Sequence, residues 1–126
     1  MSVLIAPVKA ELAFVIDGGG SAITAGVKGH LRVPFGSVIE RVTLTADQPG
    51  SIQIDIWKST YADFPPVDAG SITGGHEPAI VDNSKYDDSV LTAWSKSLNA
   101  GEILAFNVDS AATITRVTVN LQVRKR

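Results

Sequence analysis

The stretch Ile114–Val123, Ile-Thr-Arg-Val-Thr-Val-Asn-Leu-Gln-Val, decides the fold class. From Val117 onward its odd-numbered positions hold valine or leucine, and its even-numbered positions hold threonine, asparagine and glutamine. Side chains alternate between the two faces of a β-strand, so the pattern predicts a strand with one buried and one solvated face. β-Branched residues suit such a half-buried, pleated surface. This strand therefore needs other strands with which to close a hydrophobic core.

Six further runs have the composition of strands, and turn-forming residues separate most of them. The clearest is Ser51–Lys58, in which three isoleucines alternate with Gln53, Asp55 and Trp57. The other predicted strands are Glu11–Asp17, Lys28–Val33, Val38–Ala46, Val90–Leu98 and Ile103–Val108. Predicted turns lie at Gly18–Ser21, Asp47–Gly50, Asn99–Glu102 and Asp109–Ala112. The chain is therefore expected to be all-β: a single-domain antiparallel β-sandwich of the jelly-roll type.

The segment 59–89 is the least regular part of the chain. Short strand pieces are expected at 71–73 and 79–81, since a long structureless loop would be unusual in a small domain. Trp57 falls on the polar face of its strand, which leaves two interpretations: a loop covers the indole, or the indole is an exposed anchor for a partner or a sugar. Tyr61, Phe64 and Pro65 are expected to fold back over it.

A chain of 126 residues fits one domain, which we place at residues 11–126 after an extended arm at residues 1–10. The arm contains the apolar residues Val3, Leu4 and Ile5, which pack along their own domain or reach a neighbouring subunit. The N-terminal sequence matches no signal peptide, and no apolar run is long enough to span a membrane.

Composition argues against several classes of function. There is no cysteine for disulfides or thiolate metal sites, and a net charge of −2 provides no basic stripe for nucleic acid. No Gly-x-Ser-x-Gly elbow accompanies His30 or His76, and the glycine triplet at 18–20 lacks the lysine of a phosphate loop. The oxygen-rich loop with Asp82, Asn83, Asp87 and Asp88 lacks the ordered spacing of a calcium loop. We therefore expect a protein that is not an enzyme, with no catalytic residue, no cofactor and no metal.

The strand and turn signatures resemble a small β-sandwich domain of tailed-bacteriophage virion proteins. The likeness covers nearly the whole domain after the first ten residues. It is carried by Phe14–Ser21, Val33–Phe35, Arg41–Leu44, Ala46–Gln48, Asp55–Lys58, Tyr61–Pro66, Ala100–Ser110 and Ile114–Thr118.

The resemblance implies a structural virion protein made in the cytoplasm of a host bacterium. We expect a capsid decoration or cement protein that binds the assembled particle. Its expected partners are other copies of itself, in a homotrimer, and major capsid or tail proteins. The expected partner-binding residues are Val3, Leu4, Ile5, Trp57, Tyr61 and Phe64. The alternative is a tail-fibre or tail-tip module that binds a host glycan through its aromatic side chains. Neither interpretation involves nucleic acid or a membrane.

Overall fold

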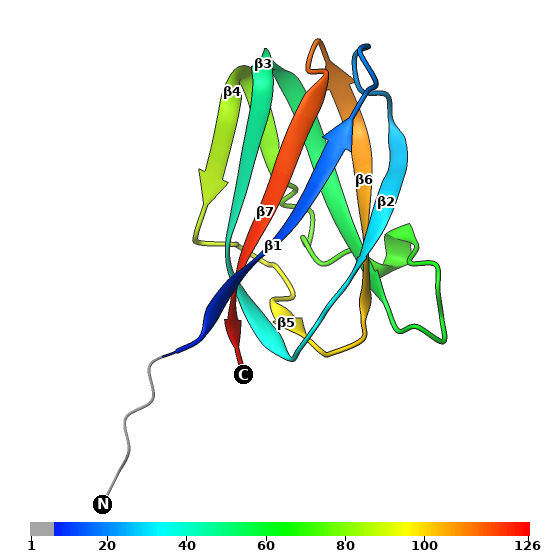
Figure 1. Cartoon of the computed structure of the whole chain (residues 1–126), viewed down its shortest axis with the longest axis vertical. Helices are drawn as coiled ribbons and strands as arrows, with labels where there is room; N and C mark the ends of the chain where they lie inside the picture. Colours follow the sequence, from blue (N-terminus) through cyan, green and yellow to red (C-terminus); the bar gives the residue numbers. More distant parts are fainter. Residues whose placement is uncertain (1–6) are drawn as a thin grey trace, which may run out of the picture.

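The computed structural model describes residues 7–126, and the regular structure of this part of the chain is almost entirely β-strand (Figure 1). The predicted all-β class is confirmed. The elements, in chain order, are β1 (Lys9–Asp17), β2 (Gly26–Arg32), β3 (Ser37–Ser59), the short 3₁₀-helix η1 (Asp68–Gly70), β4 (Ala79–Asp88), β5 (Ser97–Leu98), β6 (Ile103–Ala112) and β7 (Arg116–Lys125).

The strands form one antiparallel sheet that is folded across its middle into two layers. β1 pairs with β7 in one layer and β2 pairs with β6 in the other, so β1 and β2 follow one another along the same edge of the folded sheet. The other sides of β7 and β6 pair with β3, whose residues 37–46 lie against β7 and whose residues 51–59 lie against β6. β4 follows the other edge of β3 through both halves. The strands β3 and β4 therefore each pass from one layer into the other near their centres. The chain makes the same change of layer between β1 and β2 and between β6 and β7.

The core lies between the layers. The predicted inward residues of β7 and of the second half of β3 are all at most 1% exposed: Val117, Val119, Leu121, Val123, Ile52, Ile54 and Ile56. Phe14 of β1 stacks on Phe106 of β6 with the ring centroids 4.5 Å apart, so the two layers are in direct contact there. Gly29 makes room for this stack, because a Cβ at that position would lie 2.5 Å from the Phe14 ring.

The predicted turn at Asp47–Gly50 is wrong as a break between two strands. β3 runs through these residues, and its pairing with β4 is irregular between Thr45 and Gly50, where the sheet folds over. Asp47 fastens this corner to the start of β7: its carboxylate accepts the Arg116 N–H at 3.0 Å and the Thr115 hydroxyl. The hydrogen bond from Thr115 is the main reason that the pKa of Asp47 lies below its ordinary value. Proline and glycine here bend a strand without ending it.

The predicted strand at Val90–Leu98 is also wrong, since only Ser97 and Leu98 pair as β5. Leu91 and Trp94 are instead buried in a turn, with Leu91 1% and Trp94 7% exposed. The indole N–H of Trp94 donates to the His76 carbonyl at 3.0 Å. These apolar side chains close the core from a loop, so their burial requires no strand.

Two other stretches are more regular than expected. The segment expected to hold short pieces at 71–73 and 79–81 contains the ten-residue strand β4, while Ser71 forms an isolated bridge to Trp57. The predicted turn at Asp109–Ala112 belongs to β6, and the chain reverses afterwards. A bulge between Ile39 and Arg41 also shifts the parity of β3, so that Ile39 and Val42 both face the core.

The N-terminal boundary differs from the expected one, because Lys9 and Ala10 already belong to β1, opposite Arg124 and Val123. Val3, Leu4 and Ile5 lie outside the described residues. Within residues 7–126 the structure contains no helix with the length and apolarity needed to cross a membrane.

Candidate functional site

Trp57, the first aromatic candidate, is half-buried on the outer face of β3. Ser71 bridges to it, and its indole N–H donates to Asp55 Oδ2 at 2.9 Å. Trp57 is thus neither fully buried nor an exposed aromatic anchor. The prediction that Tyr61 and Phe64 fold back over Trp57 is wrong, because Tyr61 is 80% exposed and the Phe64 ring contacts His30 instead.

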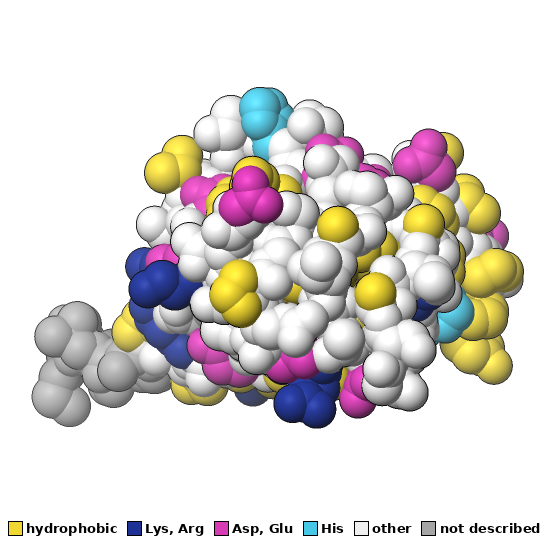
Figure 2. All heavy atoms as spheres, turned by 90° about the horizontal axis from the view of Figure 1, so that it is seen from above, with side chains coloured by type: hydrophobic (Ala, Val, Ile, Leu, Met, Phe, Trp, Pro, Cys, Tyr) yellow, Lys and Arg dark blue, Asp and Glu magenta, His cyan; other side chains and the backbone are white. Residues whose placement is uncertain are grey.

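Tyr61 and Phe64, the other aromatic candidates, are exposed. Tyr61 is 80% and Phe64 49% exposed, and the Phe64 ring lies edge-on to His30 at a centroid distance of 4.8 Å. Both belong to the loop between β3 and η1, at the right of Figure 1. In Figure 2 hydrophobic side chains gather on the same side of the molecule, next to a histidine.

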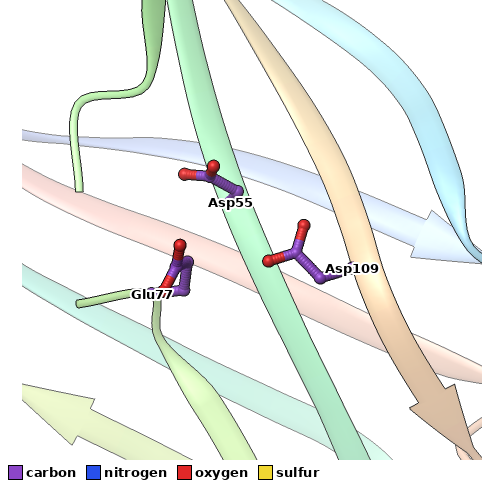
Figure 3. Close-up of side chains that lie close together, drawn as sticks. All are labelled: Asp55, Glu77 and Asp109. Atoms are coloured by element: carbon purple, nitrogen blue, oxygen red, sulfur yellow. The ribbon is translucent and has the colours of Figure 1, made fainter. Parts of the chain in front are cut away.

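Three carboxylates that the sequence did not connect meet on the outer face of the sheet. Asp55 of β3, Glu77 before β4 and Asp109 of β6 each have an oxygen within 4.8 Å of the other two (Figure 3). The residues are far apart in sequence, and β3 and β6 are paired neighbours, so the pairing of strands creates the cluster.

Neutral donors already occupy much of this cluster. Asp55 is 4% exposed and accepts four hydrogen bonds of 2.8–2.9 Å, from the Ile56 amide, the Trp57 indole and the hydroxyls of Ser71 and Thr73. Asp109 accepts the side-chain amides of Gln53 and Asn107. A cation would have to compete with these donors. The arrangement therefore serves to hold the segment 71–77 against β3.

The cluster provides a direct test of the expectation that no metal is needed. We expect the melting temperature to change by less than about 1 °C when either EDTA or millimolar Ca²⁺ is added, because the lone pairs of Asp55 are already engaged. Thermal unfolding followed by circular dichroism measures this. A rise of several degrees with Ca²⁺ that disappears in Glu77→Gln would mean that the cluster is a cation site.

The earlier calcium candidates do not gather around one point. Asp87 pairs with Arg41 and accepts the Thr43 hydroxyl, while Asp88 accepts the amide of Val90. The contacts of Asp87 hold β4 against β3, and the contact of Asp88 stabilises the turn that follows β4.

A small pocket lies at the end of the molecule where the exposed loop meets the β5–β6 turn. It has a volume of about 310 Å³ and is lined by Thr60, Tyr61 and the turn Asn99–Glu102. The turn itself is one that the sequence predicted, and its position against Tyr61 follows only from the folded sheet. The pocket and the carboxylate cluster are thus groups of side chains within residues 7–126 that the sequence did not reveal.

Comparison with known proteins gives little further guidance. No family model matches the chain, and no curated protein matches it. Similar solved structures include a serine protease of Aeromonas sobria (TM-score 0.38, 10% identity) and that protease in complex with its chaperone ORF2 (TM-score 0.40, 9% identity). Each match covers the whole of this chain but 28% of the matched chain. Likeness at this level extends no activity to the protein described here.

Proposed function

We propose that this protein is a non-enzymatic structural component of a bacteriophage virion, a decoration protein that binds an assembled protein surface. The carrying observation is the projecting loop between β3 and η1, on which Tyr61, Phe64 and Val67 are 80%, 49% and 58% exposed. Aromatic and apolar side chains are typical of the buried centres of protein interfaces. The resemblance to phage virion domains supplies the identity of the surface.

The loop has the local order that an interface segment needs. The Phe64 amide donates to the Tyr61 carbonyl at 3.2 Å, the Asp63 amide to the Thr60 hydroxyl at 3.2 Å, and the Gly70 amide to the Val67 carbonyl at 2.8 Å. A segment that is already ordered loses less conformational entropy on binding than a flexible one. The exposed side chains are therefore presented in a fixed arrangement.

The sheet edges support self-association, which we propose yields a trimer. β1 and β2 form one edge of the sheet and β4 the other, and within residues 7–126 no further strand pairs with them. Val15 on β1 and Val81 on β4 are 54% and 72% exposed. Open strand edges with exposed apolar residues favour pairing with another chain. In the proposed assembly, weak contacts of several copies with a repeated lattice add up through high effective concentration.

We also propose that the arm with Val3, Leu4 and Ile5 binds neighbouring subunits, and deletion of residues 1–7 tests this. The first backbone contact to β7 after the deleted part is the Val8 carbonyl, which accepts the Lys125 amide at 2.8 Å, so the sheet should remain intact. We expect an unchanged circular dichroism spectrum and an incorporation into particles that falls about tenfold or more, measured by mass spectrometry of purified virions.

The matched control replaces Val90, which is 72% exposed in the loop after β4, by alanine and should leave incorporation unchanged. Normal incorporation of the truncated chain, or a light-scattering mass equal to one chain at micromolar concentration, would contradict the proposal.

A further inference from the structure

We propose that the chain assembles head to tail, with the β2 edge of one copy paired to the β4 edge of the next copy. The inference rests on the self-association proposed above and names the two surfaces that form the contact. A ring of three copies needs two different surfaces on each chain, because each copy turns one surface to one neighbour and the second surface to the other. The partner of the β2 edge is therefore a second copy of this chain.

The fold provides two unlike edges in one layer. In the layer built on the second half of β3, the strands follow the order β2, β6, β3, β4. β2 and the first half of β4 are thus the two free edges of this layer, and the labels of β2 and β4 lie on opposite sides of the molecule in Figure 1. Since all neighbours in the layer are antiparallel, β2 and β4 run in opposite directions. Copies related by rotation about an axis along the strands would pair these edges antiparallel, like the rest of the sheet.

The charges of the two edges are opposite. β2 contains Lys28 and Arg32 and no acidic residue, so its net charge is +2. β4 contains three aspartates and one lysine, so its net charge is −2. Opposite charges across a strand pair stabilise it, and like charges destabilise it. Pairing of β2 with β4 is therefore favoured over pairing of either edge with its own copy.

Two further observations favour β4 as the partner of β2. Burial raises the pKa of Tyr86 in β4, and the negative charges of Asp88 and Asp87 raise it further, so this edge has a negative potential. β1, the other strand on the side of β2, contains one lysine and two acidic residues, for a net charge of −1. β1 is thus repelled by β4, and it matches the charge of β2 less well than β4 does.

Arg32 and Asp82 are the charged residues of the two edges that are most available for a contact. Both side chains are exposed. Among the described residues, Arg32 has no ion pair or side-chain hydrogen bond, and the carboxylate of Asp82 is engaged by the Ser51 hydroxyl alone, at 3.5 Å. Asp87, by contrast, already pairs with Arg41. We therefore assign the central ion pair of the contact to Arg32 and Asp82.

Exposed apolar side chains accompany the charges on both edges. Val27 of β2 is 46% exposed, and Phe64, which is 49% exposed, lies beside β2 through its contact with His30. Val81, next to Asp82 on β4, is 72% exposed. Pairing of the edges would remove these side chains from water, as expected at the centre of a protein interface.

Charge reversal tests the contact, with self-association followed by sedimentation in the analytical ultracentrifuge. Arg32→Glu and Asp82→Lys should each raise the dissociation constant of the oligomer about tenfold or more, because each places like charges across the edge pair. The double variant Arg32→Glu/Asp82→Lys should return to within about threefold of the unmodified chain, because opposite charges face each other again. Lys96→Glu is the matched control: it makes the same change of charge at an exposed position outside both edges and should leave association unchanged.

A cross-link tests the geometry independently. The chain contains no cysteine, so Arg32→Cys/Asp82→Cys should form disulfide-linked oligomers on oxidation, visible on a non-reducing gel. Lys96→Cys/Asp82→Cys should not. Circular dichroism verifies the folding of each variant. Because Asp82 has a φ of 46°, Asp82→Asn, which tolerates this conformation, replaces Asp82→Lys if the lysine variant does not fold, and it should weaken association about threefold.

The outcomes separate this inference from the proposal on which it rests. An unmodified chain that remains a monomer at micromolar concentration would overturn both. An oligomer that Arg32→Glu does not weaken, or that the cysteine pair at 32 and 82 does not cross-link, would overturn the edge pairing alone, and self-association through other surfaces would stand.

Discussion

Replacing Asp55 by alanine is expected to lower the free energy of unfolding by about 4 kcal/mol. The carboxylate is 4% exposed and accepts four hydrogen bonds, two of them from Ser71 and Thr73 and one from the Trp57 indole. Each donor that loses its acceptor in a buried place costs about 1–3 kcal/mol, and the two hydroxyls can recover part of this loss by pairing with each other. Urea denaturation followed by tryptophan fluorescence measures the effect.

Glu77→Gln is the control for the Asp55 variant, because it alters the same carboxylate cluster at a position that makes no hydrogen bond to β3. We expect its free energy of unfolding to stay within about 0.5 kcal/mol of the parent, since the change only removes repulsion with Asp55 and Asp109. A loss of less than about 1 kcal/mol in Asp55→Ala would show that the four hydrogen bonds are not what holds segment 71–77 in place.

Replacing Phe106 by alanine is also expected to lower the free energy of unfolding by about 4 kcal/mol. The side chain is fully buried and stacks on Phe14, so truncation removes apolar burial and leaves a cavity between the layers. Most small domains have a free energy of unfolding of only about 5–15 kcal/mol, so this single change would bring the protein close to unfolding. Thermal and urea melts both report the loss.

Two comparison variants show whether loss of the contact between the layers causes the destabilisation of Phe106→Ala. Phe106→Leu keeps most of the apolar volume and should cost about 1.5 kcal/mol, while Val15→Ala on the exposed side of β1 should cost less than about 0.5 kcal/mol. In a double-mutant cycle with Phe14→Ala, the stacked pair should show a coupling of about 0.5–1.5 kcal/mol. Equal losses for Phe106→Leu and Phe106→Ala would contradict the cavity argument.

The strands that could be read from the sequence are those with one fully buried face. In Arg116–Lys125 and in Ser51–Lys58 the alternation of apolar and polar residues reflects burial directly. The inward-facing valine, leucine and isoleucine residues of both stretches are at most 1% exposed. Such a pattern is local, since each residue reports its own environment. The strand β4 gave no such signal: at an edge its Asp82 and Asp87 remain in water, so its composition is that of a loop.

The sequence by itself thus determined the all-β class and the core strands β6, β7 and the second half of β3. Only the tertiary structure decided that Asp47–Gly50 is a fold line within one strand, because a bend and a chain reversal use the same residues. It also decided which polar groups meet. Asp55, Glu77 and Asp109, like Tyr61 and Glu102, are brought together by strand pairing and loop position over long sequence separations, and no local periodicity encodes such contacts.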